Sequence, residues 1–570
     1  MTGSPRFARR PAMGISVSLA LLVAALPAWA ASSFSLDNVT IDTGGATWRA
    51  ERLDVTDSAL SRDEMLALLS AKDGPPSQRF ARLNAARIAA PQLVSSQASG
   101  GATQRITYRD LVLEDVGAGR VARIRAAGAT IAVTGAQSGD ISGTAGAIGL
   151  DGVDLPALAH IVAEGRADPD EPARVLAAAG RLDALDLDLG GGARAHVDAI
   201  AFRDVGGRAL AVPTASLVDL TPKPDAPPPS PERRQALTAL LADLLTSQSI
   251  GALEATNVAT QSAAGAATRI AKVSLTGLAA GRVGRLGLEN LAVDGKTSGV
   301  FSLRQAALSG LDLTPVLDAT PGAASSFRSA RFDRIELDGF ATRAGAAGAQ
   351  PVAVELAHAA IEARDWRERA PQSVSIALDG FAFDLPADDP RARPLLDLGY
   401  KRLILSLTTD AAYDGPKNEL ALPRFALTGP DIGAIRLSAL LSNVRPDLLG
   451  PDPERTRAAL AGSLFRHAAG MAMDAGLLGR AIEAQARREN ATPAAIRARW
   501  AGSARAFVTS VLSGNPDRGA VADAAERFVR QGGSLTIEAD APGGIGLIDV
   551  MLAGGWQAAL AKLRLTAKVE

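Results

Sequence analysis

The chain has 570 residues, of which 47% are hydrophobic and 21% charged, and its formal net charge is −1 at pH 7. This balance provides enough apolar material for a folded core and excludes disorder of the whole chain, while the lack of a basic excess excludes a general nucleic-acid binder. There is no cysteine and there are only four histidines, so disulfides, thiolate metal sites and cysteine nucleophiles are excluded and no cofactor is expected.

The first thirty residues have the pattern of an export signal. Arg6, Arg9 and Arg10 precede an apolar stretch, Met13–Leu26, and Ala28–Ala30 provides a small-x-small cleavage site. The pattern predicts cleavage after residue 30 and a periplasmic mature protein, and an exported chain without cysteine is typical of a bacterial envelope. The alternative is an uncleaved inner-membrane anchor, but the apolar stretch is short for a hydrocarbon core that needs about 20 residues.

The chain after residue 30 contains degenerate internal repeats. Leu111–Ile124 and Leu275–Leu286 share the pattern Ala-Gly-Arg-Val-x-Arg, and weaker matches on both sides keep the same order in the two halves. Helix starts are expected near Ser61, Pro156, Ser230 and Pro315. This spacing predicts four to five units of about 85 residues, each with one helix followed by a meander of short strands.

Local patterns support both element types. Ser61–Glu64 is a capping box, and Ser230–Glu232 places a cap, a proline and an acid at a helix start. In the strand regions apolar side chains alternate with polar ones, as in Val374, Ile376 and Leu378. Such alternation is typical of antiparallel strands with one apolar face. The fold class is therefore α+β, mainly antiparallel β, with the repeats forming an elongated sheet.

Four regions follow along the chain. They are a signal peptide at 1–30, the first and second halves of the β-repeat region at 31–229 and 230–450, and a mostly helical C-terminal region at 451–570 that ends in two strands. A proline-rich linker, Lys223–Pro229, separates the two halves. A helix is predicted in the C-terminal region because apolar residues recur there at intervals of three and four. They are Leu460, Leu464, Ala468, Met471, Ala475, Leu478 and Ile482.

Motifs for chemistry are missing. Gly117–Ala122 imitates a dinucleotide fingerprint and Asp294–Thr297 imitates a phosphate loop, but each lies between expected strands and is interpreted as a turn. Asp183, Asp186 and Asp188 alternate with apolar residues, which indicates a solvated sheet face rather than a calcium site. The histidines, His160, His196, His358 and His467, are too far apart for a local metal motif. No catalytic, cofactor-binding or metal residue is predicted, ligand-binding residues stay unknown, and the chain is not expected to be an enzyme.

The two Ala-Gly-Arg-Val segments carry a more specific prediction. Gly119 and Gly281 are expected to adopt positive φ in hairpin turns. Arg120 and Arg282 would then occupy equivalent places on the wet face at the start of the return strand, and the valine after each would enter the apolar face.

Several strand regions contain Leu-x-Gly followed by an aromatic residue or leucine, as in Leu337–Phe340, Leu378–Phe381 and Leu308–Leu311, where the pattern is expected to end a strand. The stretch Tyr400–Val444 also contains long alternating strands. In this general pattern, residues 34–450 resemble the AsmA-like repeating β-groove proteins of Gram-negative envelopes. The resemblance implies lipid handling or outer-membrane homeostasis.

The leading functional expectation is a non-enzymatic periplasmic protein that binds lipid or another amphipath along an apolar sheet face and serves envelope homeostasis. The expected partners are a lipid or outer-membrane component, or an envelope protein, and not nucleic acid. The alternative is a structural or assembly scaffold that binds protein partners without a small ligand. A carbohydrate-active or hydrolytic enzyme is a third hypothesis, but the aromatic side chains are scattered rather than grouped into a sugar-stacking platform.

Overall fold

The structure is a computed structural model. It describes residues 32–43, 46–70, 74–99, 102–135, 139–166, 168, 170–211, 230–295, 299–317, 330–344, 352–367, 370–449, 453–548 and 556–570. The expected signal peptide, the linker Lys223–Pro229 and residues 296 and 297 of the Asp294–Thr297 segment lie outside the described residues.

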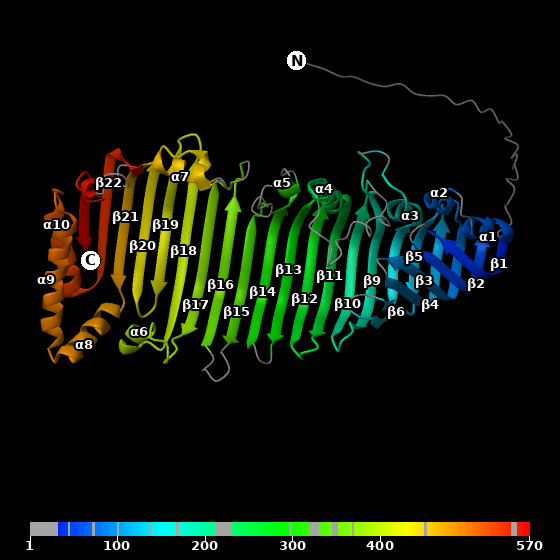
Figure 1. Ribbon diagram of the computed structural model, residues 1–570, viewed down its shortest axis with the longest axis horizontal. Helices are drawn as coiled ribbons and strands as arrows, with labels where there is room; N and C mark the ends of the chain where they lie inside the picture. Colours follow the sequence, from blue (N-terminus) through cyan, green and yellow to red (C-terminus); the bar gives the residue numbers. More distant parts are fainter. Residues whose placement is uncertain are drawn as a thin grey trace, which may run out of the picture.

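In the described part of the chain, one long antiparallel sheet of 23 strands forms the body of the protein (Figure 1). The strands are β1 Ser32–Asp42, β2 Thr47–Ser58, β3 Ala85–Ser99, β4 Ala102–Gly117, β5 Arg120–Ala126, β6 Gly128–Thr134, β7 Ile141–Ala145, β8 Ile148–Asp154, β9 Arg174–Asp188, β10 Arg194–Gly207, β11 Gln248–Gln261, β12 Ala267–Ala279, β13 Arg282–Asp294, β14 Val300–Asp312, β15 Arg334–Ala344, β16 Val352–Arg364, β17 Ser373–Asp384, β18 Arg402–Asp414, β19 Glu419–Gly429, β20 Gly433–Ser442, β21 Leu464–Asp474, β22 Ser534–Gly546 and β23 Arg564–Val569. The predicted antiparallel β class is confirmed.

The helices are short for the most part. They are α1 Arg62–Ser70, α2 Pro76–Phe80, α3 Leu155–Ala163, α4 Pro231–Ser247, α5 Thr314–Leu317, α6 Arg393–Asp397, α7 Pro453–Ala461, α8 Leu477–Glu489, α9 Pro493–Val511, α10 Arg518–Gln531 and α12 Trp556–Leu560, with a 3-10 turn at Pro446–Leu449. No helix in the described ranges is long and apolar enough to cross a bilayer.

The strands follow one another in a simple meander. Each strand from β10 to β22 pairs with its predecessor and its successor in the chain. Near the N-terminal end, β5 and β6 lie end to end along β4, and β7 and β8 lie end to end along β9. The sheet is therefore continuous across residues 229–230 and 450–451, where the sequence suggested region boundaries.

Most helices lie along the two sides of the sheet at which the strands begin and end, while α9 and α10 stand at its C-terminal end. In Figure 1, α1 to α5 and α7 lie along one side, while α6 and α8 lie along the other. This is the expected outcome of a meander, because connections that leave every second strand emerge at the same side. Helix starts are capped as the sequence predicts: the backbone N–H of Ser61 donates to Glu64 Oε2 over 2.9 Å, and the N–H of Arg233 donates to Ser230 Oγ over 3.3 Å.

A buried ion cluster fixes α4 against the end of β10. Asp243 of α4 accepts hydrogen bonds from Arg166 Nη1 at 3.0 Å, from Arg208 Nη1 at 2.8 Å and from the backbone N–H of Ala211 at 2.7 Å. The three charged side chains are only 12 to 16% exposed. Removing the carboxylate would leave two guanidinium groups without their counter-charge.

A line of left-handed residues crosses the sheet and creases it. Ala184, Asn257, Asn290, Gly339 and Gly380 sit in alternate strands from β9 to β17, with φ between 46° and 63°, and the strand register places them on one transverse line. Asparagine and glycine tolerate this conformation better than other residues do. A left-handed residue departs from the extended backbone and bends the strand, although the pairing register on both sides of Asn257 and Asn290 is unchanged.

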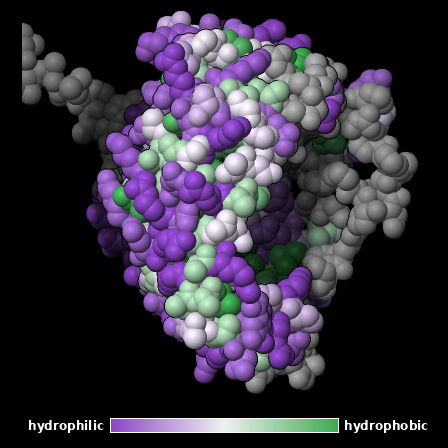
Figure 2. Space-filling view, turned by 90° about the vertical axis from the view of Figure 1, so that its left-hand side faces the viewer, coloured by the Kyte–Doolittle hydropathy of each residue, from purple (hydrophilic) through white to green (hydrophobic). Residues whose placement is uncertain are grey.

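The crease also keeps one face apolar. In β13, Leu286 and Leu288 face the same side as Leu291 and Val293, because Asn290 between them shifts the alternation by one residue. A second line of positive φ runs nearer the side of the sheet that carries most helices, through Gly277 and Gly310, among others. The sheet therefore curls into a trough. Figure 2, which views the molecule from the C-terminal end, shows a hollow with hydrophobic residues in its depth and a largely hydrophilic outer surface.

Two larger clusters of buried apolar side chains lie at opposite ends of the sheet. At the N-terminal end, Met65 and Leu69 of α1 pack with Leu36, Leu53 and other residues of the first strands. At the C-terminal end, α9 and α10 pack on β22 and β23. The largest clusters among the described residues therefore lie at the ends, where helices cover the apolar face, while the middle strands also carry single buried side chains such as Leu303 and Leu403.

Two expectations about local structure are wrong. The segment Leu464–Asp474 is the strand β21, not part of a helix, because its alanines and glycine also fit between two strands and both of its edges find partners. Two of the three Leu-x-Gly patterns do not end strands: Gly339 and Gly380 lie inside β15 and β17, where their positive φ forms the crease. The third, Leu308–Leu311, does lie at the end of β14, which stops at Asp312.

Candidate functional site

The inner face of the trough is lined by rows of apolar side chains that run across successive strands. The register aligns one row from β11 to β17 through Leu253, Leu275, Leu286, Leu308, Ile335, Ile361 and Ile376. A second row runs from β11 to β20 through Ala255, Val273, Leu288, Ala306, Leu337, Ala359, Leu378, Leu407, Leu427 and Ile435. None of these side chains is charged.

Beyond the crease a third row continues the apolar lining. It includes Val258, Ile270, Leu291, Leu303, Phe340, Leu356, Phe381 and Leu405, from β11 to β18. The three rows together make a continuous hydrocarbon-like surface in the middle of the sheet. Val374, Ile376 and Leu378, whose alternation the sequence predicts, belong to this inner face, so the prediction is confirmed there.

Parts of this surface are open to solvent among the described residues. Val273 is 37% exposed, Phe381 38%, Ile435 47% and Leu437 44%. By contrast, Leu36 and Met65 at the N-terminal end are fully buried. The exposed Val273, Phe381 and Ile435 lie on β12, β17 and β20 within the apolar rows, and their burial by a ligand would be favourable, so the inner face is a candidate interaction surface.

The outer face of the same strands is charged and internally paired. Lys272 Nζ lies 2.6 Å from Glu254 Oε2, and Arg424 Nε lies 2.8 Å from Asp410 Oδ2. The hydrogen bond from Ser375 Oγ to Asp410, followed by the Arg424 contact, lowers the pKa of the Asp410 carboxyl, while Glu254 raises the pKa of Lys272. Cross-strand pairs of opposite charge are common on the solvent-exposed face of a sheet. The outer face therefore contacts water, whereas the inner face is apolar.

Each histidine is held by carboxylates. His160 Nδ1 lies 2.8 Å from Glu164 Oε2 and its Nε2 lies 3.0 Å from Glu171 Oε1. Partial burial alone would lower the pKa of His160, but the hydrogen bonds to the two glutamates outweigh it and the pKa is raised. His358 and His467 each have one aspartate partner, Asp338 at 2.7 Å and Asp540 at 2.8 Å.

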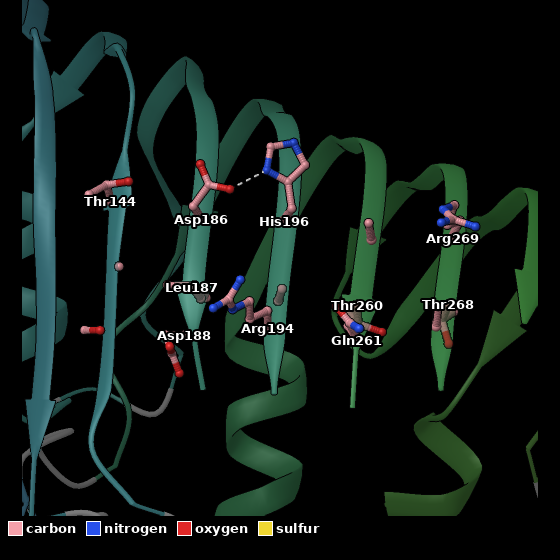
Figure 3. A pocket seen from close by; sticks show the side chains of 15 residues that line it. Thr144, Asp186, Leu187, Asp188, Arg194, His196, Thr260, Gln261, Thr268 and Arg269 are labelled. Atoms are coloured by element: carbon pink, nitrogen blue, oxygen red, sulfur yellow. Dashed lines mark hydrogen bonds and ion pairs between the residues drawn. The ribbon is translucent and has the colours of Figure 1, made fainter. Parts of the chain in front are cut away.

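His196 lines an open polar depression of about 580 Å³ at the ends of β9 to β12 (Figure 3). Its Nδ1 lies 2.6 Å from Asp186 and its Nε2 lies 2.8 Å from Asp198, and these contacts raise the pKa of the imidazole. Figure 3 shows the strands that carry Asp186 and His196 bending over directly above these residues. Arg194 and Arg269 also line the depression. It belongs to the wet outer wall of the trough.

The three aspartates considered for calcium have separate partners. Asp183 Oδ1 lies 2.7 Å from Arg181 Nε, Asp186 contacts His196, and Asp188 accepts from the backbone N–H of Gly190 at 3.0 Å. Within the described part of the chain, no group of three or more His, Asp or Glu side chains is placed to hold a metal ion.

The two Ala-Gly-Arg-Val turns are confirmed as equivalent hairpins. Ala118 and Gly119 have φ of 51° and 74°, and Ala280 and Gly281 have 49° and 76°, as a two-residue turn with positive φ at both positions requires. A strand, not a helix, follows each turn, so the fingerprint-like Gly117–Ala122 is a turn as expected.

The arginines after these turns repeat the same contact. Arg120 Nε lies 3.3 Å from Asp154 and Arg282 Nε lies 3.4 Å from Asp312, with the two arginines 79% and 68% exposed. The valines that follow, Val121 and Val283, are 1% and 6% exposed and face the trough side, as predicted. The arginines therefore brace the ends of their hairpins on the wet face.

Residues 426–570 match a family whose description reads "uncharacterized protein", which covers about a quarter of the chain. No curated protein matches the chain.

Proposed function

We propose that this chain is an exported, non-enzymatic protein of the bacterial envelope that holds the hydrocarbon part of a lipid, or of another amphipath, in the apolar trough. The observation that carries the proposal is the set of uncharged rows on the inner face, which stay partly exposed between β11 and β20. The charged groups of the same strands are paired on the opposite face.

The concave shape narrows the class of occupant. A second flat sheet cannot enter a trough that curls around its own long axis, whereas a flexible hydrocarbon tail can lie along it. A tail of roughly 14 methylene groups gains about 11 kcal/mol at about 0.8 kcal/mol per buried CH₂. At the low end of the association cost, about 4 kcal/mol, complete burial of the tail leaves about 7 kcal/mol, which corresponds to a dissociation constant on the order of 10 µM. Measurable binding therefore requires most of the tail to be covered.

Further features of the proposal concern location and architecture. The export pattern at 1–30 favours the periplasm. A helix, an Ala-Gly turn and a second helix follow one another twice along the side of the sheet that carries most helices. The first set is α1, the turn at Ala118–Gly119 and α3, and the second is α4, the turn at Ala280–Gly281 and α5. This order supports a sheet built from repeats of a helix and a strand meander, followed by a helix-rich C-terminal region.

The proposal is tested by native mass spectrometry after gentle purification, followed by titration with a fluorescent fatty acid. The expected result is a co-purifying lipid mass and saturable uptake of the fatty acid by the delipidated protein. A clean ligand-free mass together with no uptake would refute the proposal.

A second candidate is a scaffold that binds protein partners at the ends of the sheet. Its support is that β1, 11 residues long, pairs only with β2 among the described strands and so offers its outer edge for strand addition. Pull-down from envelope extracts with and without a proline in β1 would separate the two candidates, because the lipid proposal does not require that edge.

A further inference from the structure

We infer that the trough is blind at its N-terminal end, where the ring of Phe202 closes it, and that it holds the tails of a lipid with at least two acyl chains between β11 and β20. This inference rests on the proposed function and adds to it the extent of the site, the class of lipid and the residue that limits it.

Phe202 of β10 continues the first apolar row toward the N-terminal end of the sheet. By the register its neighbours are Leu253 on β11 and Gly180 on β9. A Cβ built on Gly180 would lie 2.2 Å from Cζ of Phe202 and 2.8 Å from Cδ2 of Leu150 on β8. The phenyl ring therefore lies over the glycine and reaches toward Leu150, so that the space above β9 is occupied by the protein itself.

On the N-terminal side of Phe202 the apolar face is covered by a packed hydrophobic core. Phe202 and Leu150 pack against a cluster that contains Leu36, Leu53 and Met65, with exposed fractions of 0%, 5% and 0%. Here α1 lies on β1 and supplies the covering side chains. On the other side of Phe202 the inner face opens, as the 37 to 47% exposure of Val273 and Ile435 shows. The boundary between filled and open surface therefore lies between Phe202 on β10 and Val273 on β12.

The length of the open part indicates the class of lipid. From β11 to β20 there are nine steps between neighbouring strands, and at about 4.8 Å each they span about 43 Å. One leaflet of a bilayer has a hydrocarbon thickness of about 15 Å, half of the full core. A single tail would therefore leave more than half of the exposed apolar surface in water, whereas two or more tails cover most of it. Because the apolar rows offer no charged or polar partner, the polar headgroup stays outside them, at the solvent-exposed opening of the trough.

The extent of the site is tested with a diazirine-labelled palmitic acid, irradiated on the full chain and mapped by mass spectrometry. Labels are expected on inner-face residues such as Val273, Leu288 and Phe381, and not on Leu36 or Met65. In Phe202→Ala the labelled region is expected to extend to Leu150. The control Phe340→Ala removes an aromatic ring inside the trough and should leave the N-terminal limit unchanged.

Labels on Leu36 or Met65 in the wild-type protein, or an unmoved limit in a folded Phe202→Ala variant, would overturn the blind end. If that variant does not fold, Phe202→Leu provides the same comparison with a smaller change. Native mass spectrometry of the delipidated protein with a two-tailed phospholipid should give one bound molecule where palmitic acid gives at least two. A single bound palmitic acid would overturn the two-tail inference. No label on the inner face under any condition would instead refute the proposed function itself.

Discussion

Gly119 is the position at which the architecture makes its sharpest prediction about stability. Its φ is 74°, which costs an L-residue about 1–2 kcal/mol. A Cβ there would lie 2.3 Å from the carbonyl oxygen of Phe80 and 2.8 Å from Cδ of Pro156. A backbone oxygen and a proline ring cannot move aside cheaply, and overpacking of this kind adds about 1–3 kcal/mol. Gly119→Ala should therefore destabilise the N-terminal end by about 2–5 kcal/mol.

The matched control is Gly117, two residues away on β4. It has no positive φ and no heavy atom within 4 Å of a built Cβ, so Gly117→Ala should change stability by less than about 0.5 kcal/mol. Because a chain of this length need not unfold in one step, native-state hydrogen exchange of β4 and β5 is the appropriate assay, with urea unfolding beside it. Equal effects of the two substitutions would refute the hairpin reasoning.

Three further outcomes follow from particular contacts. Gly281→Val should lower the free energy of unfolding by more than about 1 kcal/mol because of the positive φ at this position. Arg282→Ala should lower it by less than about 1 kcal/mol because the arginine is 68% exposed. Urea unfolding that gave the opposite order would indicate a functional arginine. The folded-state pKa of His160 is raised, so its contribution to stability is fully present below the unfolded pKa of about 6.5 and is lost as pH rises through the folded pKa. His160→Gln should therefore cost more at pH 5.5 than at pH 8.5 in thermal unfolding, and a cost that grew with pH would contradict the pairing with two glutamates. Asp243→Ala should destabilise the protein by about 3 kcal/mol, since it leaves two largely buried guanidinium groups unpaired, and a neutral effect by the same assay would show that water already screens them.

The sequence predicts those parts of the fold that are decided by local chemistry. The helix starts at Ser61 and Ser230 depend on side chains within one turn of the backbone they cap, and the structure places helices there. The Ala-Gly turns depend on two residues with positive φ, and the burial of Val121 and Val283 follows from strand alternation. The periodicity of apolar residues and the residue types at turns are enough to predict these features, because they do not depend on which strands lie next to them.

The features that the sequence analysis misses depend on partners far along the chain. Leu464–Asp474 has apolar residues that satisfy both a helical and an extended pattern, and only its pairing with β20 and β22 decides for a strand. The crease at Asn257 and Asn290 requires the register of many strands at once, although an asparagine between two apolar runs is a local signal for it. Phe202 could not be recognised as the end of a trough, because its significance depends on Gly180 on the adjacent strand and on the core behind it.

The central claim is that the inner face of the sheet binds hydrocarbon tails, and titration of two single variants with a fluorescent fatty acid tests it most directly. Val273→Asp places a carboxylate in the inner row at a side chain that is already 37% exposed, so the fold should tolerate it. Thr276→Asp places the same charge on the exposed outer face of the same strand, β12, opposite Arg285. A carboxylate covered by a hydrocarbon tail loses its hydration, so Val273→Asp should weaken fatty-acid binding at least about tenfold while Thr276→Asp leaves it unchanged. Equal binding by both variants and the wild-type protein, or a loss confined to Thr276→Asp, would contradict the claim.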